Sequence, residues 1–240
     1  MGRGPSIENR KNAEDAKKAK SFTKFIREIT MAARASGGDP AGNPRLRTAI
    51  DKALHANMTR DTIERAIKRG TGEGGGAAVE EVRYEGYGPG GVAILVDCMT
   101  DNPTRTVAEV RHAFSKQGGN LGTSGSVAFQ FIETGEIIFD IRAQPELEEK
   151  IMELALDAGA DDVQTDEGFT DVLTSPAAFE AVKNKLEGAG LKPIEADVVM
   201  RPSNRVAVEG EAADTLKALI DWLEELDDVQ DVHHNADLPA

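Results

Sequence analysis

The sequence has few of the residues that mark secreted or membrane-spanning proteins. Its 240 residues include one cysteine, one tryptophan and two tyrosines. Cys98 therefore cannot form an internal disulfide, and its place in the apolar run 92–99 predicts a small buried thiol. No run approaches the roughly 20 apolar residues of a spanning helix, and the first residues show no signal-peptide core. We expect a cytoplasmic protein without membrane contact.

The sequence also lacks the residue groupings of common catalytic and metal sites. The histidines at positions 55, 112, 233 and 234 have no metal-ligand spacing with Cys98. The acidic pairs Asp161-Asp162 and Asp227-Asp228 stand in turn-like sequence before expected strands. That position favours a solvated surface over paired catalytic carboxylates. We therefore predict that the protein is not an enzyme and that it binds no metal and no cofactor.

The chain does have a strongly uneven distribution of charge. Its net charge is −14 and its pI is about 4.8, which taken alone would argue against a nucleic-acid partner. Residues 1–70, however, carry 16 Lys and Arg against 8 Asp and Glu, a net charge of +8. Residues 71–240 carry 12 against 34, a net charge of −22. One end of the chain therefore attracts a polyanion and the rest repels it.

The basic end of the chain predicts a small helical module. Apolar residues recur every three or four positions over 21–35, and the run Ser36 to Pro40 ends that helix. A second helix is expected to begin with Asn43 as N-cap and Pro44 at its first position. A third is expected to begin near Thr59 and to end at Gly70. Residues 1–20 are polar and lysine-rich, which predicts a basic arm that is only partly helical.

The rest of the chain predicts an α+β fold. The Gly-rich stretch 70–78, where the charge changes sign, has the composition of a linker. Residues 136–199 predict the order of a split β-α-β-β-α-β unit. The sequence on either side of that unit predicts further strands and helices. The strands are expected near 81–87, 92–99, 126–133, 205–209 and 229–233, and the helices at 104–117 and 212–226. We therefore predict three domains: a helical domain (1–78), an α+β domain (79–133 plus 205–240), and an inserted ferredoxin-like domain (134–204), with turns at 133–135 and 201–204. Both α+β domains are expected to be ferredoxin-like.

Four cations of the first expected helix fall on one face. Lys20, Lys24, Arg27 and Arg34 are spaced by 4, 3 and 7 residues, with no acid in the middle of that stripe. A solvated helix surface is the plain alternative, but the charge contrast favours contact with nucleic-acid phosphates. Phe22 and Phe25 lie on the apolar stripe, so backbone contact is better supported than base reading. The other candidates are Arg3, Arg10, Lys11, Lys17, Lys18, Arg45, Arg47, Lys52, Arg60, Arg65, Lys68 and Arg69.

Three other motifs have structural interpretations. Gly86 to Gly91 matches G-x-G-x-x-G, but it leads into a strand, so a hairpin turn is favoured over a dinucleotide loop. The run Gly118 to Gly125 lacks the lysine of a phosphate-binding loop and predicts a loop with residues at positive φ. Asp101 to Thr106 opens a helix, where Arg105 could contact an anion, although capping alone is favoured.

Several long and uncommon sequence motifs stand out, among them residues 22–29, 43–47, 63–70, 84–91, 100–102, 105–111 and 118–122. In these motifs the chain resembles the YebC/PmpR family, whose relatives include mitochondrial translational activators. The resemblance implies a helical domain followed by two α+β domains. It also implies two activities, DNA binding by a transcriptional regulator and a ribosome-associated role in translating difficult stretches such as consecutive prolines. The segment Gly4 to Ile7 differs from the His-Ser-Lys-Trp motif with which family members usually begin.

Our first hypothesis is a DNA-binding transcriptional regulator that uses the basic helical face. The alternative is a translation factor that binds ribosomal RNA and associates with the ribosome. A scaffold that binds only proteins through its acidic domains would leave the basic module unexplained. We expect a monomer in each case, because nothing in the sequence indicates an oligomer.

Overall fold

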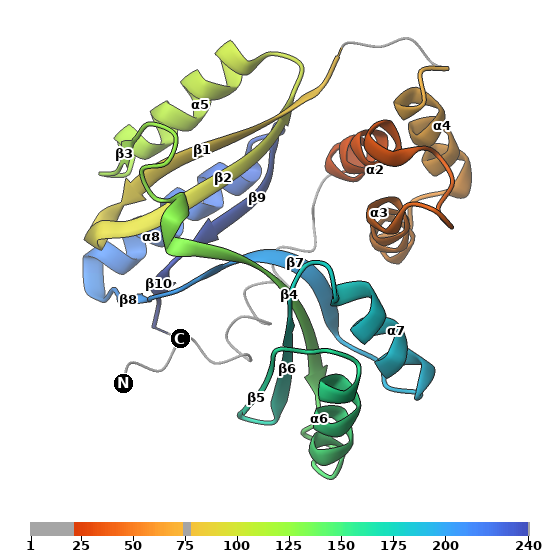
Figure 1. Cartoon of the computed structure of the whole chain (residues 1–240). Helices are drawn as coiled ribbons and strands as arrows, with labels where there is room; N and C mark the ends of the chain where they lie inside the picture. Colours follow the sequence, from red (N-terminus) through yellow and green to blue (C-terminus); the bar gives the residue numbers. More distant parts are fainter. Residues whose placement is uncertain (1–21, 74–77, 240) are drawn as a thin grey trace. The chain divides into compact units, whose positions relative to one another are not determined.

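The computed structural model describes residues 22–73 and 78–239 (Figure 1). These residues fall into two compact units. One unit contains residues 22–73, the helical segment, together with residues 78–128 and 208–234, the first α+β domain. The other unit contains residues 129–207 with 235–239, the second α+β domain. The α+β fold class expected from the sequence is confirmed.

The helical segment consists of α2 (Phe22–Ser36), α3 (Pro44–His55) and α4 (Arg60–Gly70). The predicted caps are present: the Asn43 side chain accepts a hydrogen bond from the backbone N–H of Leu46, and Thr59 caps α4. The three helices bury a core of their own around Ile29, Leu46 and Ile63. The prediction that Phe22 is part of the core is wrong. Phe22 is the first residue of α2, at the end of the apolar stripe, and it is 50% exposed.

The first α+β domain has one four-stranded sheet, in the order β3-β1-β2-β9. Its strands are β1 (Glu80–Gly88), β2 (Val92–Thr100), β3 (Asn120–Leu121) and β9 (Val229–His234), and its helices are α5 (Pro103–Lys116) and α8 (Gly210–Glu225). The short η1 turn (Pro89–Gly91), with Gly90 and Gly91 at positive φ, joins β1 to β2. The G-x-G-x-x-G segment is therefore a hairpin, as predicted. Because two paired strands precede α5, this domain does not have the β-α-β-β-α-β order.

The second α+β domain has the split β-α-β-β-α-β order that the sequence predicts. It runs through β4 (Phe131–Asp140), α6 (Leu147–Asp157), β5 (Asp162–Asp166), β6 (Phe169–Thr174), α7 (Phe179–Gly188) and β7 (Glu195–Pro202). The antiparallel sheet has the order β5-β6-β4-β7. Ile137, Phe139 and Val172 on the sheet pack with Ile151 of α6 and Leu186 of α7.

The ends of the second α+β domain differ from the predicted boundaries. No turn interrupts residues 133–135, because Thr134 and Gly135 are paired with β7 inside one long β4. The η2 turn (Ala128–Gln130) precedes that strand. Residues 205–209 yield only β8 (Val206–Ala207), which pairs in parallel with β10 (Ala236–Asp237) rather than joining the first sheet. Within the described residues the chain passes between the two units at 128/129, 207/208 and 234/235. No helix among the described residues could cross a membrane.

The thiol of Cys98 is expected to be unreactive in the folded protein. Cys98 is a buried residue of β2, and burial, together with the charges of Asp97 and Asp228, raises the pKa of its thiol to about 12. Because the thiolate is the reactive form, a thiol reagent at about pH 8 should leave native Cys98 unmodified and modify it rapidly in guanidinium chloride. Mass spectrometry after timed alkylation measures this difference. Complete modification of the native chain would contradict the buried position.

Candidate nucleic-acid interface

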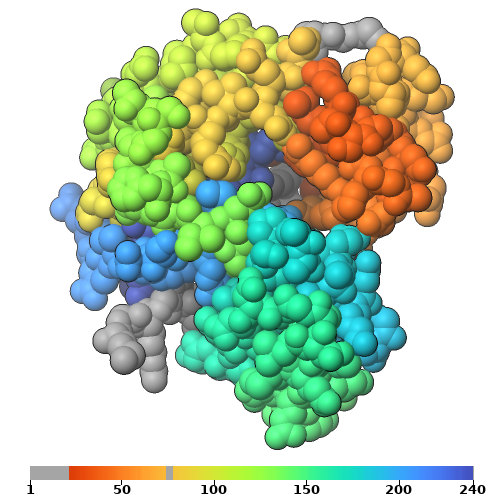
Figure 2. Space-filling view, in the orientation of Figure 1, coloured from red at the N-terminus to blue at the C-terminus, as the bar shows by residue number. Residues whose placement is uncertain are grey.

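The basic candidates divide into those within the described residues and those outside them. Arg3, Arg10, Lys11, Lys17, Lys18 and Lys20, and the divergent segment Gly4 to Ile7, lie outside the described residues. Their part in nucleic-acid binding stays a prediction. The other candidates lie on α2, α3 and α4, which form one continuous surface, coloured orange in Figure 2.

Lys24 and Arg27 of α2 contact the first α+β domain instead of facing solvent. Lys24 is 6% exposed, and its ammonium group donates to the backbone oxygen of Glu224 near the end of α8. Arg27 donates to the Asp228 carboxylate at 2.7 Å and to the backbone oxygens of Met99 and Asp227, each at 2.9 Å. In this arrangement neither side chain presents its charge to a phosphate.

Asp228 is the buried acid at the centre of this contact. Its side chain is 2% exposed, and it accepts hydrogen bonds from Arg27 on α2 and from Arg105 and Thr106 on α5, the last two at 2.8 and 2.7 Å. Burial alone would raise the pKa of Asp228, but the hydrogen bonds from Arg105, Thr106 and Arg27 together lower it below its usual value. The ionised Asp228 carboxylate, just before β9, therefore connects α2 of the helical segment with α5 of the first α+β domain.

Two further cations of the predicted interface also contact the first α+β domain. Arg34, near the end of α2, donates to the backbone oxygen of Val79 at 2.8 Å. Arg45 of α3 forms ion pairs with Glu28 on α2 and with Glu81 on β1. The row that the sequence assigns to phosphates thus lies along the contact between the helical segment and the first α+β domain.

The cations of α4 have a different environment. Arg60, Lys68 and Arg69 are exposed, and no acidic side chain among the described residues lies within ion-pair distance of them. Arg65 pairs with Asp61 one turn earlier on the same helix. Lys52 on α3 is also exposed. Among the described cations of the helical segment, Arg60, Lys68 and Arg69 therefore present their charge to solvent.

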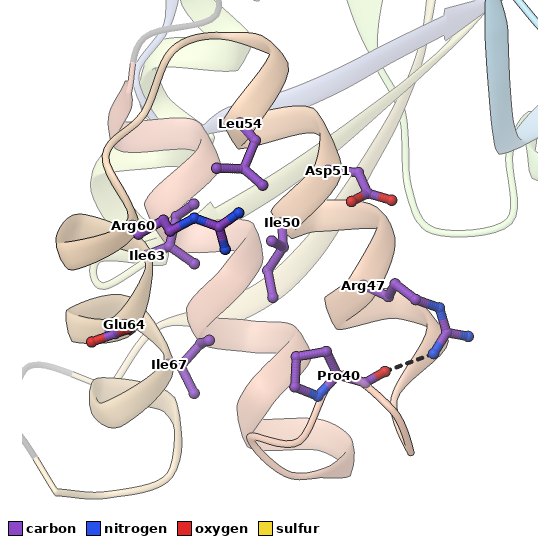
Figure 3. A pocket seen from close by; sticks show the side chains of 9 residues that line it. All are labelled: Pro40, Arg47, Ile50, Asp51, Leu54, Arg60, Ile63, Glu64 and Ile67. Atoms are coloured by element: carbon purple, nitrogen blue, oxygen red, sulfur yellow. Dashed lines mark hydrogen bonds between the residues drawn. The ribbon is translucent and has the colours of Figure 1, made fainter.

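A groove of about 380 Å³ lies between α3 and α4 (Figure 3). Ile50, Leu54, Ile63 and Ile67 give it an apolar floor. Two arginines and two acids also line it, so its charges balance and it does not favour phosphate. These four residues are Arg47, Asp51, Arg60 and Glu64.

Arg105 and the Gly118 to Gly125 loop have structural partners in the first α+β domain. Asn102 caps α5 by accepting from the Arg105 backbone N–H, and the Arg105 side chain contacts Asp101 and Asp228. Gly118 and Gly125 are at positive φ, as the loop prediction requires.

Residues 125–128, at the end of this loop, are held by the buried carboxylate of Glu85. Glu85 accepts hydrogen bonds from the backbone N–H groups of Gly125, Val127 and Ala128 at 2.5, 3.0 and 2.7 Å. Burial acts to raise the pKa of Glu85, but these three hydrogen bonds lower it overall.

The most important residue that sequence reasoning missed is Asp228. The Asp227-Asp228 pair was expected to be solvated, which holds for Asp227 but is wrong for Asp228. The reason is that Asp228 directly precedes β9, next to β2, and its carboxylate meets Thr106 and Arg105 from α5. Its partners lie more than 100 residues away along the chain, so no local pattern could identify it. Glu81 and Glu85 were also missed, because their partners lie 36 and 40 to 43 residues away along the chain.

Comparisons with known proteins cover nearly the whole chain. Residues 4–73 match the model described as the TACO1/YebC protein N-terminal domain, and residues 79–236 match the model of the TACO1/YebC second and third domain. The chain is 59% identical over 242 residues to a "Probable transcriptional regulatory protein" of Xanthomonas oryzae pv. oryzae, covering 100% of this chain and 99% of the relative. It is 60% identical to one from Stenotrophomonas maltophilia, covering 100% and 98%.

A solved structure extends the likeness to three dimensions. The crystal structure of a conserved hypothetical protein from Aquifex aeolicus has a TM-score of 0.82 and 46% sequence identity to this chain. The match covers 94% of this chain and 93% of that one. Since the two family models together span nearly the whole sequence, and the relatives match it from end to end, the chain belongs to the TACO1/YebC family.

Proposed function

We propose that this protein is a non-enzymatic regulator of gene expression that binds the backbone of nucleic acid, with DNA as its target, through its basic N-terminal residues. The observation that carries this proposal is the segregation of charge, +8 over residues 1–70 against −22 over the remainder. Within the described part of those residues, the exposed cations of α4 supply contacts of the kind that phosphates prefer. Relatives named as transcriptional regulators support the same role.

Removing the α4 cations should weaken nucleic-acid binding and reduce its dependence on salt. The variant carries Arg60→Gln, Lys68→Gln and Arg69→Gln, all on exposed positions of the helical segment. Each lost phosphate contact lowers the steepness of the log–log salt dependence by about 0.9 on duplex DNA, so a decrease of up to about 3 is expected. Fluorescence anisotropy with a labelled duplex over a range of salt concentrations measures it.

The matched control removes the same amount of charge elsewhere. Arg111→Gln, Lys116→Gln and Lys192→Gln are exposed substitutions outside the helical segment. The control should bind as the unmodified protein does. Equal losses in both triple variants would show that only net charge matters and would contradict an interface on α4.

The nature of the target is tested separately. A transcriptional regulator should prefer one promoter duplex over random DNA by at least about a thousandfold and should be absent from ribosomal fractions. RNase-sensitive co-sedimentation with intact ribosomes, together with weak and sequence-indifferent DNA binding, would instead identify the translation factor that binds ribosomal RNA. The A-form groove and the 2′-hydroxyl distinguish the two targets, whereas lysine contacts to phosphate do not.

A further inference from the structure

The contact between the helical segment and the first α+β domain pairs cations with oxygen acceptors of the kind a phosphate offers. Lys24 and Arg27 contact backbone oxygens and a carboxylate at the end of α8 and in the turn before β9. The last carbonyl groups of a helix carry partial negative charge, which adds to the charge of Asp228. The end of α8 with Asp228 therefore gives these cations what a nucleic-acid backbone would give them.

The helical segment does not depend on this contact for its own core. Its buried cluster is drawn entirely from α2, α3, α4 and the turns between them, with Ala32, Ala53 and Ala66 fully buried there. The described contacts that carry charge across to the first α+β domain are those of Lys24, Arg27, Arg34 and Arg45. A Gly-rich sequence, residues 70–78, joins the two parts. A segment with its own core, polar links and a glycine-rich connection can separate without unfolding.

We propose that this contact is an autoinhibitory latch, in which the end of α8 with Asp228 occupies the α2 cations until nucleic acid displaces it. This inference rests on the proposed function. The latched form offers the α4 cations to a first encounter, and release adds the α2 row to the interface. Because the same side chains cannot serve both partners, binding and latching exclude each other, and the apparent affinity is reduced by the fraction of molecules that are latched.

Two substitutions weaken the latch while leaving every cation in place. Asp228→Asn removes the charge that Arg27 contacts, and Glu81→Gln removes the charge that Arg45 contacts. Asp157→Asn is the matched control, because it removes the same charge from an exposed ion pair with Lys185 in the second α+β domain, outside the proposed interface. If Asp228→Asn fails to fold, Glu81→Gln is compared with the control instead. The Glu81 side chain is half-exposed, so its substitution should not prevent folding.

The experiment measures separation and binding in the full-length protein. Spin labels are placed on Ala35→Cys at the end of α2 and on Ser115→Cys in α5, both exposed, while native Cys98 stays buried and unlabelled. Pulsed electron–electron double resonance then gives the distribution of distances between the two spin labels. The latch predicts a short, narrow distribution in the protein alone and longer distances with saturating duplex DNA. Asp228→Asn should show the longer distances without DNA and should bind about tenfold more tightly than the Asp157→Asn control.

The outcomes separate the two proposals. An unchanged distance distribution in the presence of bound DNA, or latch variants that bind no more tightly than Asp157→Asn, would overturn the latch and leave the proposed function standing. Absence of binding to DNA and to ribosomal RNA by every variant would overturn the proposed function, and the autoinhibitory role with it. The distances in the absence of nucleic acid would still report whether Asp228 holds the segment in place.

Discussion

Replacing Asp228 with alanine is expected to lower the free energy of unfolding by about 3 to 5 kcal/mol. The carboxylate is 2% exposed and accepts from Arg27, Arg105 and Thr106. Alanine leaves two arginines without their shared acid and the hydroxyl group of Thr106, which is fully buried, with one acceptor fewer. Urea denaturation followed by circular dichroism measures the change.

The comparison for this prediction is Asp61→Ala. Asp61 forms an exposed ion pair with Arg65 one turn along α4, with side chains 77% and 64% exposed. Pairs of this kind contribute about 0.3 to 0.5 kcal/mol, so Asp61→Ala should change the free energy of unfolding by less than about 1 kcal/mol. A similarly small change for Asp228→Ala would mean that Asp228 is not the buried acceptor shared by Arg27, Arg105 and Thr106.

Replacing Gly70 with alanine should destabilise the helical segment by about 1 to 3 kcal/mol, although alanine is the better helix former. Gly70 ends α4 where that helix crosses α2. A Cβ atom there would lie 2.4 Å from the backbone oxygen of Thr30 and 2.7 Å from the Cβ atom of Ala33. The backbone oxygen cannot rotate away, so α4 would have to move away from α2.

Gly42→Ala is the matched control for the Gly70 prediction. A Cβ atom at Gly42, in the turn before α3, would meet no atom within 4 Å. Its substitution should leave the melting temperature unchanged or raise it slightly, because alanine reduces the conformational freedom of the unfolded chain. If Gly70→Ala melted at the same temperature as Gly42→Ala, the close approach of α2 and α4 would be contradicted.

The sequence predicted those elements whose determinants are local. Asn43 and Thr59 mark helix starts, and the spacing of apolar residues gives the buried faces of α2, α3 and α4. Two predictions failed where pairing between strands overrides local sequence. Thr134 and Gly135 resemble a turn but continue β4 because β7 pairs beside them. Residues 205–209 resemble a strand of the first sheet, but their pairing partner is β10.

The candidate interface shows the same division between local and distant determinants. The cations were identified from their spacing and from the change of charge along the chain. Their surroundings were not predictable, because Lys24 and Arg27 meet acceptors about 200 residues away in the sequence. Helical periodicity places side chains on a common face, but it does not specify whether solvent, nucleic acid or another part of the chain covers that face. Lys24 and Arg27 were therefore expected to be open and are covered in the structure, whereas Arg34 is exposed.

The most direct test of the central claim is the salt dependence of binding between the unmodified protein and nucleic acid. If residues 1–70 contact the phosphate backbone, the affinity for a duplex should fall linearly on a log–log plot as salt rises, with a slope of several units. The acidic protein should thus bind a polyanion tightly at low salt despite its net charge of −14. Absence of binding to DNA and to ribosomal RNA at low salt, or an affinity that does not change with salt, would contradict the account.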